Sequence, residues 1–339
     1  MSDRPASDIR VMKFGGSSLA DGTCLRRAAA RVAAARTTGT QLAVVVSARG
    51  DTTDRLLGLA ADISARPGTR EVDQLLATGE TESAALFALA LQELGIPATS
   101  LMAHQAVIRA AGQHSRGTIA AITPDRINRL LAQGAVPVLA GFQGVDEGHD
   151  LITLGRGGSD TTAVALAASL RAERCEIYTD VDGIYSADPR VVPGARRLPA
   201  VEVDVMVEMA YAGATVMHSR AVELAASHSV DVHVISSFKE HQGTVITTTS
   251  KGVEESVLEE QSVVVAVAHD LNSVQVRVTT HDGSHRLTEQ ILTALADQGL
   301  TLDLLTRSDP SGSAVSFTTA ATDVGGGHTV SSADSARAA

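Results

Sequence analysis

The chain has 339 residues and a formal net charge of −11, with 28 lysine and arginine residues against 39 aspartate and glutamate residues. This length predicts two domains, and the acidic balance argues against nucleic-acid or anionic-membrane binding, which depends on clustered basic side chains. The sequence has no apolar run near the ~20 residues of a membrane span, no signal segment, and only 2 cysteines, too few for a disulfide framework or a structural zinc site. We therefore expect a cytoplasmic protein that binds neither nucleic acid nor membranes.

Short β-branched runs alternate with long Ala- and Leu-rich stretches over the first three-quarters of the chain, which predicts an α/β fold with a mostly parallel sheet flanked by helices. Apolar runs typical of strands buried on both faces cover residues 9–14, 42–47, 136–140, 176–179 and 232–236. Helical patterns between them cover residues 21–38, 72–94, 124–133, 161–170 and 203–212. One doubly wound unit over residues 1–247 accounts for this order.

The remainder of the chain predicts a linker, a small module and a tail. Residues 248–262 are polar and acidic, as in a connector. The module, residues 263–322, has patterns for strands at 263–268 and 273–279, a helix at 287–298, and strands at 300–306 and 314–319. Residues 323–339 are rich in Gly, Ser and Ala with almost no large apolar side chain, which predicts a disordered tail.

The first candidate ligand-binding segment is Lys13-Phe14-Gly15-Gly16-Ser17-Ser18, at the end of the first predicted strand. Ligands of α/β folds bind at the carboxyl ends of the strands. Paired glycines let backbone N–H groups approach an anion, and a lysine neutralises phosphate oxygens. An ordinary glycine turn is the alternative, but only three cations of this chain are lysines, which favours phosphate binding at Lys13. The segment is not a Walker loop.

Two further segments combine glycines with charged or hydroxyl side chains. Residues 155–162 read Gly-Arg-Gly-Gly-Ser-Asp-Thr-Thr before an Ala-rich helix. Ser159 or Asp160 is a good N-cap, but three glycines and an arginine exceed what a cap needs, and an arginine binds a carboxylate through two hydrogen bonds. Residues 179–190 resemble a calcium loop without the spacing of an EF-hand, and a solvated turn explains them equally well. Glu80, taken alone, is typical of a solvated helix face.

Together with Ser47 and Thr53 after the second predicted strand, Gly79-Glu80 and residues 141–144, these segments resemble the aspartate kinase family in order and spacing. The resemblance implies the amino-acid-kinase fold and ATP-dependent phosphorylation of the side-chain carboxylate of L-aspartate to 4-phospho-L-aspartate. It implies ATP with Mg²⁺, no metal site built by the protein itself, and Lys13 and Asp160 as catalytic residues. The implied substrate-binding residues are Ser47, Thr53, Glu80, Arg156 and Ser159. The implied nucleotide-binding residues are Lys13, Gly15, Gly16, Ser17, Thr179, Asp180, Tyr185, Asp188 and Arg190.

The sequence departs from the family pattern in two places. Thr215 stands where members carry a lysine that contacts ATP, a charge that Arg190, Arg220 or a partner chain would have to replace. Residues 263–322 resemble one ACT module where members carry two, so we expect a homo-oligomer through this module with little feedback inhibition. A catalytically impaired regulatory or binding subunit, and a kinase of another amino dicarboxylate, remain alternatives.

Overall fold

The computed structural model describes residues 7–36, 39–214, 216–240, 243–248, 265–269, 273–279, 287–297, 304–307 and 314–320. The chain forms two compact units. The first unit comprises Met1–Ala210 and Ala214–Ala268, and the second comprises Tyr211–Gly213 and His269–Ala339. In the described ranges, no helix is long and apolar enough to cross a membrane.

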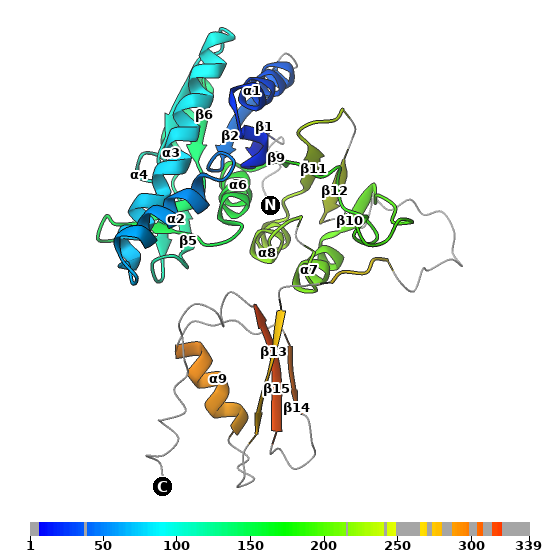
Figure 1. Cartoon of the computed structure of the whole chain (residues 1–339). Helices are drawn as coiled ribbons and strands as arrows, with labels where there is room; N and C mark the ends of the chain where they lie inside the picture. The colour runs from blue at the N-terminus through cyan, green and yellow to red at the C-terminus, as the bar shows by residue number, and fades with distance from the viewer. Residues whose placement is uncertain are drawn as a thin grey trace, which may run out of the picture. The chain divides into compact units, whose positions relative to one another are not determined.

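An eight-stranded sheet forms the centre of the first unit, in the order β10-β12-β11-β9-β1-β2-β6-β3 (Figure 1). Every neighbouring pair is parallel except β11 and β12, which are antiparallel. The five strands predicted from apolar runs all lie in this sheet, so the predicted α/β fold is confirmed. The strands are β1 Ser7–Phe14, β2 Gln41–Val46, β3 Ala98–Leu101, β6 Val136–Ala140, β9 Ala172–Thr179, β10 Ala200–Glu202, β11 Val232–Ser236 and β12 Thr244–Thr247.

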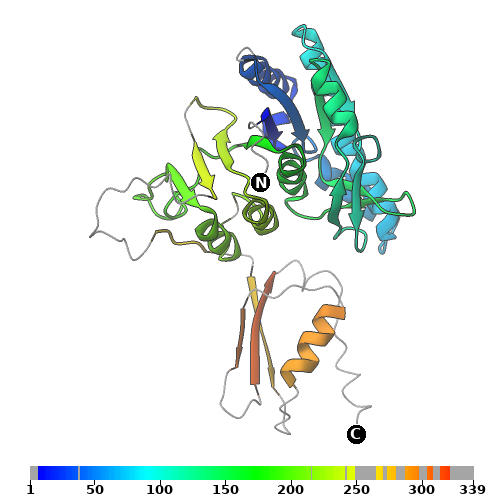
Figure 2. The ribbon, with the colours of Figure 1, turned by 180° about the vertical axis from the view of Figure 1, so that it is seen from behind.

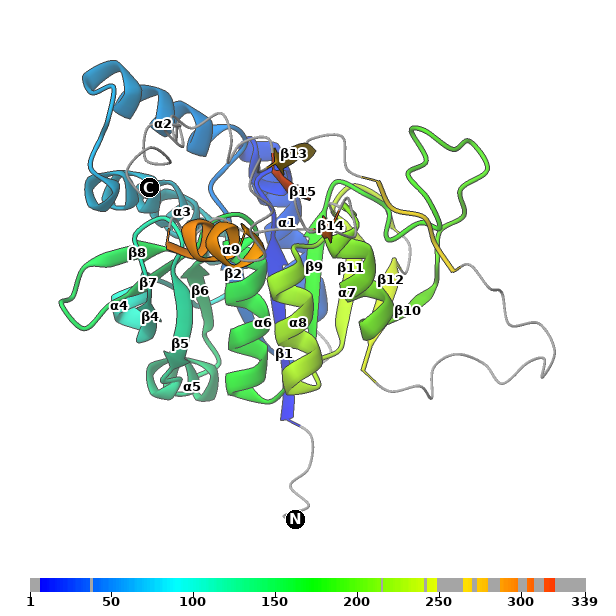
Figure 3. The ribbon, with the colours of Figure 1, turned by 90° about the horizontal axis from the view of Figure 1, so that it is seen from below.

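Helices cover both faces of this sheet. Helices α1 (Gly22–Arg36) and α3 (Thr69–Glu93) lie side by side on one face, as the front and back views show (Figures 1 and 2). On the other face α6 (Gly158–Leu170) lies beside α8 (Ser219–His228), seen from below in Figure 3. Successive strand residues point to opposite faces. Phe14 accordingly joins the core under α1 and α3, whereas Val11 joins the core under α6 and α8.

Several short elements complete the first unit. A second sheet has the order β5-β4-β7-β8. The remaining elements are η1 Ser17–Leu19, α2 Thr52–Ile63, α4 Ala103–Ala106, β4 Ile108–Ala111, β5 Thr118–Ile122, α5 Asp125–Ala132, β7 Gln143–Val145, β8 Leu151–Thr153 and α7 Val203–Tyr211.

The second unit contains a three-stranded antiparallel sheet in the order β13-β15-β14. Its elements are β13 Ser273–Thr279, α9 Leu287–Asp297, β14 Leu304–Arg307 and β15 Ala314–Ala320. The strand predicted at residues 263–268 is wrong over its described part, because residues 265–268 form no strand and belong to the first unit. There the Val267 N–H donates to the Ser186 carbonyl (2.9 Å). Residues 249–262 of the predicted linker, residues 263–264 of this predicted strand, and the predicted tail, residues 323–339, lie outside the described residues.

Candidate active site

The loops after five parallel strands meet at the carboxyl edge of the large sheet. Strands β1, β2, β6, β9 and β11 end at this edge because they run in the same direction. Backbone hydrogen bonds tie their loops to one another: Gly15 N–H to Tyr178 O, Ser47 N–H to Phe14 O, Gly50 N–H to Gly16 O, Gly141 N–H to Val46 O, and Ser237 N–H to Thr179 O. Backbone hydrogen bonds therefore join the loops at this edge. Ligands of α/β folds usually bind at this edge of the sheet.

A buried ion pair joins two motifs that are far apart along the chain, at the end of β1 and the start of α6. The Nζ atom of Lys13 lies 2.6 Å from Oδ1 of Asp160. The two residues are only 8% and 9% exposed. Strand alternation turns Lys13 toward α6, on the face opposite Phe14. Each of these buried charges requires the other, because burying either one alone costs much free energy.

Glycine allows the loops to approach one another at two places. A Cβ atom at Gly16 would lie 2.7 Å from the Ala48 carbonyl oxygen, so a side chain there requires the loops to separate. Gly157 has φ +66°, and a Cβ there would overlap the Cβ of His218. The Gly15 N–H already donates to Tyr178 O (3.1 Å), so this amide is engaged within the protein.

Glu80 is buried, contrary to the solvated helix face that its position alone suggests. It is 4% exposed on α3, and its Oε1 accepts a hydrogen bond from the Ala48 N–H (3.0 Å). Its Oε2 has no hydrogen-bond partner in the described part of the chain. Burial raises the pKa of Glu80 to about 7. Gly79 permits this depth, because a Cβ there would lie 2.9 Å from the Ala48 Cβ.

The other residues expected to bind the substrate surround the same loops. Ser47 and Thr53 are half-buried, after β2 and in the first turn of α2. Ser159 is buried at the start of α6, and a Cβ at Gly141 would lie 2.9 Å from its Oγ. Arg156 is exposed, in the loop before α6. The hydroxyls thus lie after β2 and in the first turns of α2 and α6, the Glu80 carboxylate lies in the middle of α3, and the arginine lies in the loop before α6.

The segment expected to bind the nucleotide begins where β9 ends. The Thr179 hydroxyl donates to Asp180 (3.1 Å). Arg190 pairs with Asp188 within the same loop, with 2.7 Å between Nη2 and Oδ2, and Tyr185 forms an isolated bridge to Arg197. Ser17 is exposed at the turn after β1. Thr215, the substituted lysine position, lies outside the described residues.

The structure shows two contacts at this edge that sequence patterns did not predict. The Ser18 hydroxyl lies 2.5 Å from the Ser237 hydroxyl and joins the turn after β1 to the loop after β11. His218 caps α8, where its Nδ1 accepts a hydrogen bond from the Arg220 N–H (3.4 Å), and burial lowers its pKa. The Ser18 contact links residues far apart in sequence, so a local pattern cannot reveal it.

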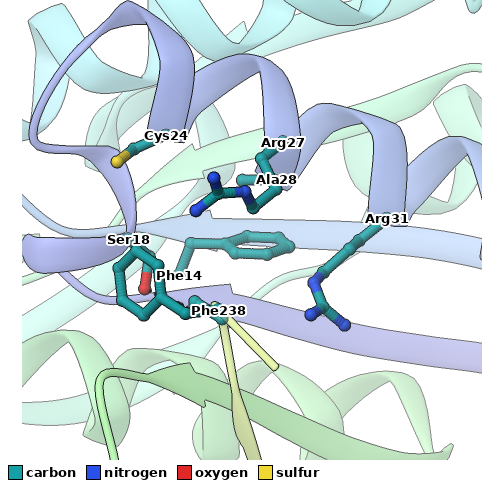
Figure 4. A pocket seen from close by; sticks show the side chains of 8 residues that line it. Phe14, Ser18, Cys24, Arg27, Ala28, Arg31 and Phe238 are labelled. Atoms are coloured by element: carbon teal, nitrogen blue, oxygen red, sulfur yellow. Dashed lines mark hydrogen bonds between the residues drawn. The ribbon is translucent and has the colours of Figure 1, made fainter. Parts of the chain in front are cut away.

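A small pocket lies on the opposite face of the sheet from Lys13, beneath α1 (Figure 4). It is lined by Phe14, Ser18, Cys24, Arg27, Ala28, Arg31, Ser237 and Phe238. The Arg27 guanidinium lies 5.6 Å from the centre of the Phe238 ring, and the Phe14 ring stacks on Tyr178. These contacts indicate a packed edge of the hydrophobic core, with arginine side chains lying over aromatic rings. Among the described residues, no group of three or more His, Cys, Asp or Glu side chains could hold a metal ion.

Comparison with known proteins finds aspartokinases among the relatives of this chain. The chain is 44% identical over 296 residues to an aspartokinase of Mycolicibacterium smegmatis, covering 87% of this chain and 69% of that protein. It is 42% identical over 312 residues to an aspartokinase of Thermus thermophilus, covering 91% and 75%.

Solved structures show the same likeness. Escherichia coli aspartokinase III in complex with aspartate and ADP has a TM-score of 0.73 at 25% identity, covering 92% of this chain and 78% of that chain. The aspartate kinase of Synechocystis has a TM-score of 0.64 at 36% identity, covering 92% of this chain but 52% of that one, so this chain spans about half its length. Residues 8–236 match the amino acid kinase family. With the Lys13–Asp160 pair at the shared edge, this match shows that the chain belongs to the amino acid kinase family.

Proposed function

We propose that the chain is an aspartate kinase, which transfers the γ-phosphoryl group of ATP to the side-chain carboxylate of L-aspartate. The observation that carries the proposal is the 2.6 Å ion pair that joins the loop after β1 to the start of α6. The aspartokinase relatives at 42–45% identity support the same reaction. Bound aspartate and ADP in the E. coli structure support the two substrates.

Catalysis of this reaction requires the protein to position the two substrates and to neutralise the negative charge of the phosphates. A carboxylate oxygen of aspartate attacks the γ-phosphorus, the bond to the bridging oxygen breaks, and ADP leaves with that electron pair. The attacking carboxylate, with an ordinary pKa of about 3.9, is ionised at neutral pH and needs no general base. The Lys13 ammonium stabilises negative charge on the transferring group, and Asp160 holds that ammonium in place.

Each substrate has its own set of residues. Glu80 carries an unpaired buried oxygen suited to the substrate ammonium, and Arg156 is suited to its α-carboxylate. Ser47, Thr53 and Ser159 supply hydroxyls. Lys13, Gly15, Gly16, Ser17, Thr179, Asp180, Tyr185, Asp188 and Arg190 are the proposed nucleotide-binding residues. Mg²⁺ enters with ATP as part of that substrate, because Mg²⁺ is held largely by phosphates and water.

The second unit is proposed as an ACT-like regulatory module through which copies of the chain associate. Its order of strand, helix, strand, strand is the described part of the pattern that the sequence predicted. The alternative of a catalytically impaired subunit rests on Thr215 alone, and the identity to aspartokinases does not favour it.

Hydroxylamine trapping tests the proposal. The purified chain, given L-aspartate and MgATP, should form aspartyl hydroxamate, and Lys13→Ala should abolish most of it. A panel of other amino dicarboxylates in the same assay identifies the preferred acceptor. Absence of hydroxamate at high enzyme concentration, or equal rates for the wild type and Lys13→Ala, would refute the proposed activity.

A further inference from the structure

The loop that carries Arg156 is held on one side by a fully buried carboxylate. Asp73 of α3 is 0% exposed. It accepts hydrogen bonds from the Thr153 N–H (2.9 Å) and the Thr153 hydroxyl (2.7 Å), at the end of β8. Its other donors are the N–H and hydroxyl of Ser115 and a ring nitrogen of His114. No lysine or arginine is needed, because these five donors satisfy the buried charge.

The same loop is held on the other side by an arginine. The guanidinium of Arg220 on α8 donates to the Leu154 carbonyl (2.7 Å) and to the Gly117 carbonyl (2.9 Å). Gly117 is itself bonded to the loop, because its N–H donates to Thr153 O (2.9 Å). Both terminal nitrogens of Arg220 are therefore engaged with backbone. Arg220 acts on the loop rather than replacing the missing lysine at a phosphate.

These two contacts add to the backbone hydrogen bond from the Leu154 N–H to Phe142 O (2.9 Å), and they matter because the loop's own backbone is permissive. Arg156 lies between Gly155 and Gly157, whose φ angles are +73° and +66°. Glycine loses more conformational freedom on ordering than any other residue. The side toward α6 is fixed by the helix, so the strand side, at residues 153–154, is where Asp73 and Arg220 hold it.

We propose that Asp73 and Arg220 form a clasp that positions Arg156 for the α-carboxylate of the amino-acid substrate. This inference rests on the proposed function, since it assigns Arg156 to that carboxylate. Both clasp members are positioning residues, and neither needs to touch the substrate. Loosening the clasp weakens binding of the amino acid and leaves ATP binding unchanged, because the nucleotide segment lies on other loops.

The test measures steady-state kinetics of Arg220→Lys, Arg220→Met and Thr153→Val beside the wild type. Arg220→Lys keeps the cation but reaches one carbonyl, and Thr153→Val removes one donor to Asp73 with little change of volume. Arg36→Met is the matched control, since Arg36 also donates to a backbone carbonyl, that of Gly134 (2.6 Å), away from this loop. We expect Arg220→Met to raise KM for aspartate about tenfold, equivalent to about 1.4 kcal/mol, with KM for ATP unchanged.

A substrate analogue separates positioning from general stability. L-Isoasparagine keeps the reacting side-chain carboxylate but has an amide in place of the α-carboxylate. Arg220→Met should reduce the preference for aspartate over this analogue, as Arg156→Met does. In the Arg156→Met background, Arg220→Met should have little further effect on KM for aspartate, because two changes in one chain of contacts are not additive.

The outcomes are distinct. Lower thermal stability with an unchanged preference for aspartate over L-isoasparagine, in both Arg220→Lys and Thr153→Val, would overturn the clasp while leaving the proposed activity intact. A rise of KM for ATP in parallel with KM for aspartate would overturn the clasp as well. Should Arg220→Met not fold, Arg220→Lys and Thr153→Val decide the question. A wild type that forms no aspartyl hydroxamate overturns the proposed function, and the clasp with it.

Discussion

Aspartate binding should displace a proton from Glu80 at mildly acid pH. Burial raises the pKa of Glu80 from its ordinary value of 4.5 to about 7, and only its Oε1 has a hydrogen-bond donor, the Ala48 N–H, among the described residues. A rise of this size corresponds to about 3 kcal/mol against the ionised form, at about 1.4 kcal/mol per pH unit. A substrate ammonium beside Oε2 favours the ionised form. The free site is therefore protonated below neutral pH, and the occupied site is not.

Isothermal titration of aspartate in two buffers of different ionisation enthalpy measures this proton. At pH 6 we expect close to one proton released per aspartate bound, and at pH 8 almost none. Glu93→Gln, an exposed change at the end of the same helix, should behave as the wild type. Glu80→Gln should bind aspartate weakly and release no proton. Binding by the wild type without proton release at pH 6 would refute the assigned role of Glu80.

The same pKa also predicts how stability depends on pH. A carboxyl whose pKa is raised in the folded state holds its proton more tightly when folded, so unfolding free energy falls as pH rises from 4.5 to about 7. The full cost, up to about 3 kcal/mol, remains above that range. In urea denaturation, Glu80→Gln should gain stability relative to the wild type between pH 5 and pH 8. A difference that is equal at both pH values would contradict the buried charge.

Four further changes test the rest of the site. Lys13→Met should lower kcat by about 10²–10³, and Lys13→Arg should not restore it, because a planar guanidinium does not reproduce a compact ammonium. Asp160→Asn leaves the Lys13 charge unpaired, so urea denaturation should show that the free energy of unfolding falls by about 3 kcal/mol. In thermal-shift measurements, MgATP should stabilise this variant more than it stabilises the wild type. Gly16→Ala places a Cβ 2.7 Å from the Ala48 carbonyl oxygen, so KM for ATP should rise. Thr215→Lys should tighten ATP binding by about tenfold in calorimetry, as expected for one charge-assisted hydrogen bond, and unchanged affinity would remove this position from the nucleotide site.

The sequence predicted most of the long elements, but it missed helix α8 and the shortest strands. Strand β2 was predictable because a nearly unbroken apolar run marks a strand buried on both faces. Strands β7 and β8 have three residues each, too few for a period of two to stand out. Residues 265–268 form a continuous apolar run like that of a buried strand, yet they belong to the first unit and form no strand there.

The site was predictable where chemistry and position coincide. A rare lysine at a strand end and a carboxylate in a glycine-rich helix start mark Lys13 and Asp160 as candidates, and their catalytic roles, which the family resemblance implies, stay predictions. Glu80 is different, because its burial depends on a close approach of α3 to Ala48 that only the folded chain reveals. The sequence suggested Arg220 only as a replacement for the missing lysine charge; its contacts with the loop could not be predicted, since its partners are backbone carbonyls 66 and 103 residues away.

The pairing of Lys13 with Asp160 explains why this chain keeps a lysine where it otherwise prefers arginine. An ammonium has three donors in a compact head, so Lys13 can form an ion pair with Asp160 at 2.6 Å and still present donors to phosphate oxygens. A guanidinium would meet the carboxylate with a planar fork and commit two donors to it. The carboxylate also balances the buried charge before the nucleotide arrives, because an uncompensated ammonium at 8% exposure would be costly to bury. Under the proposed function, the ion pair therefore both compensates the buried charges and positions the ammonium for phosphoryl transfer.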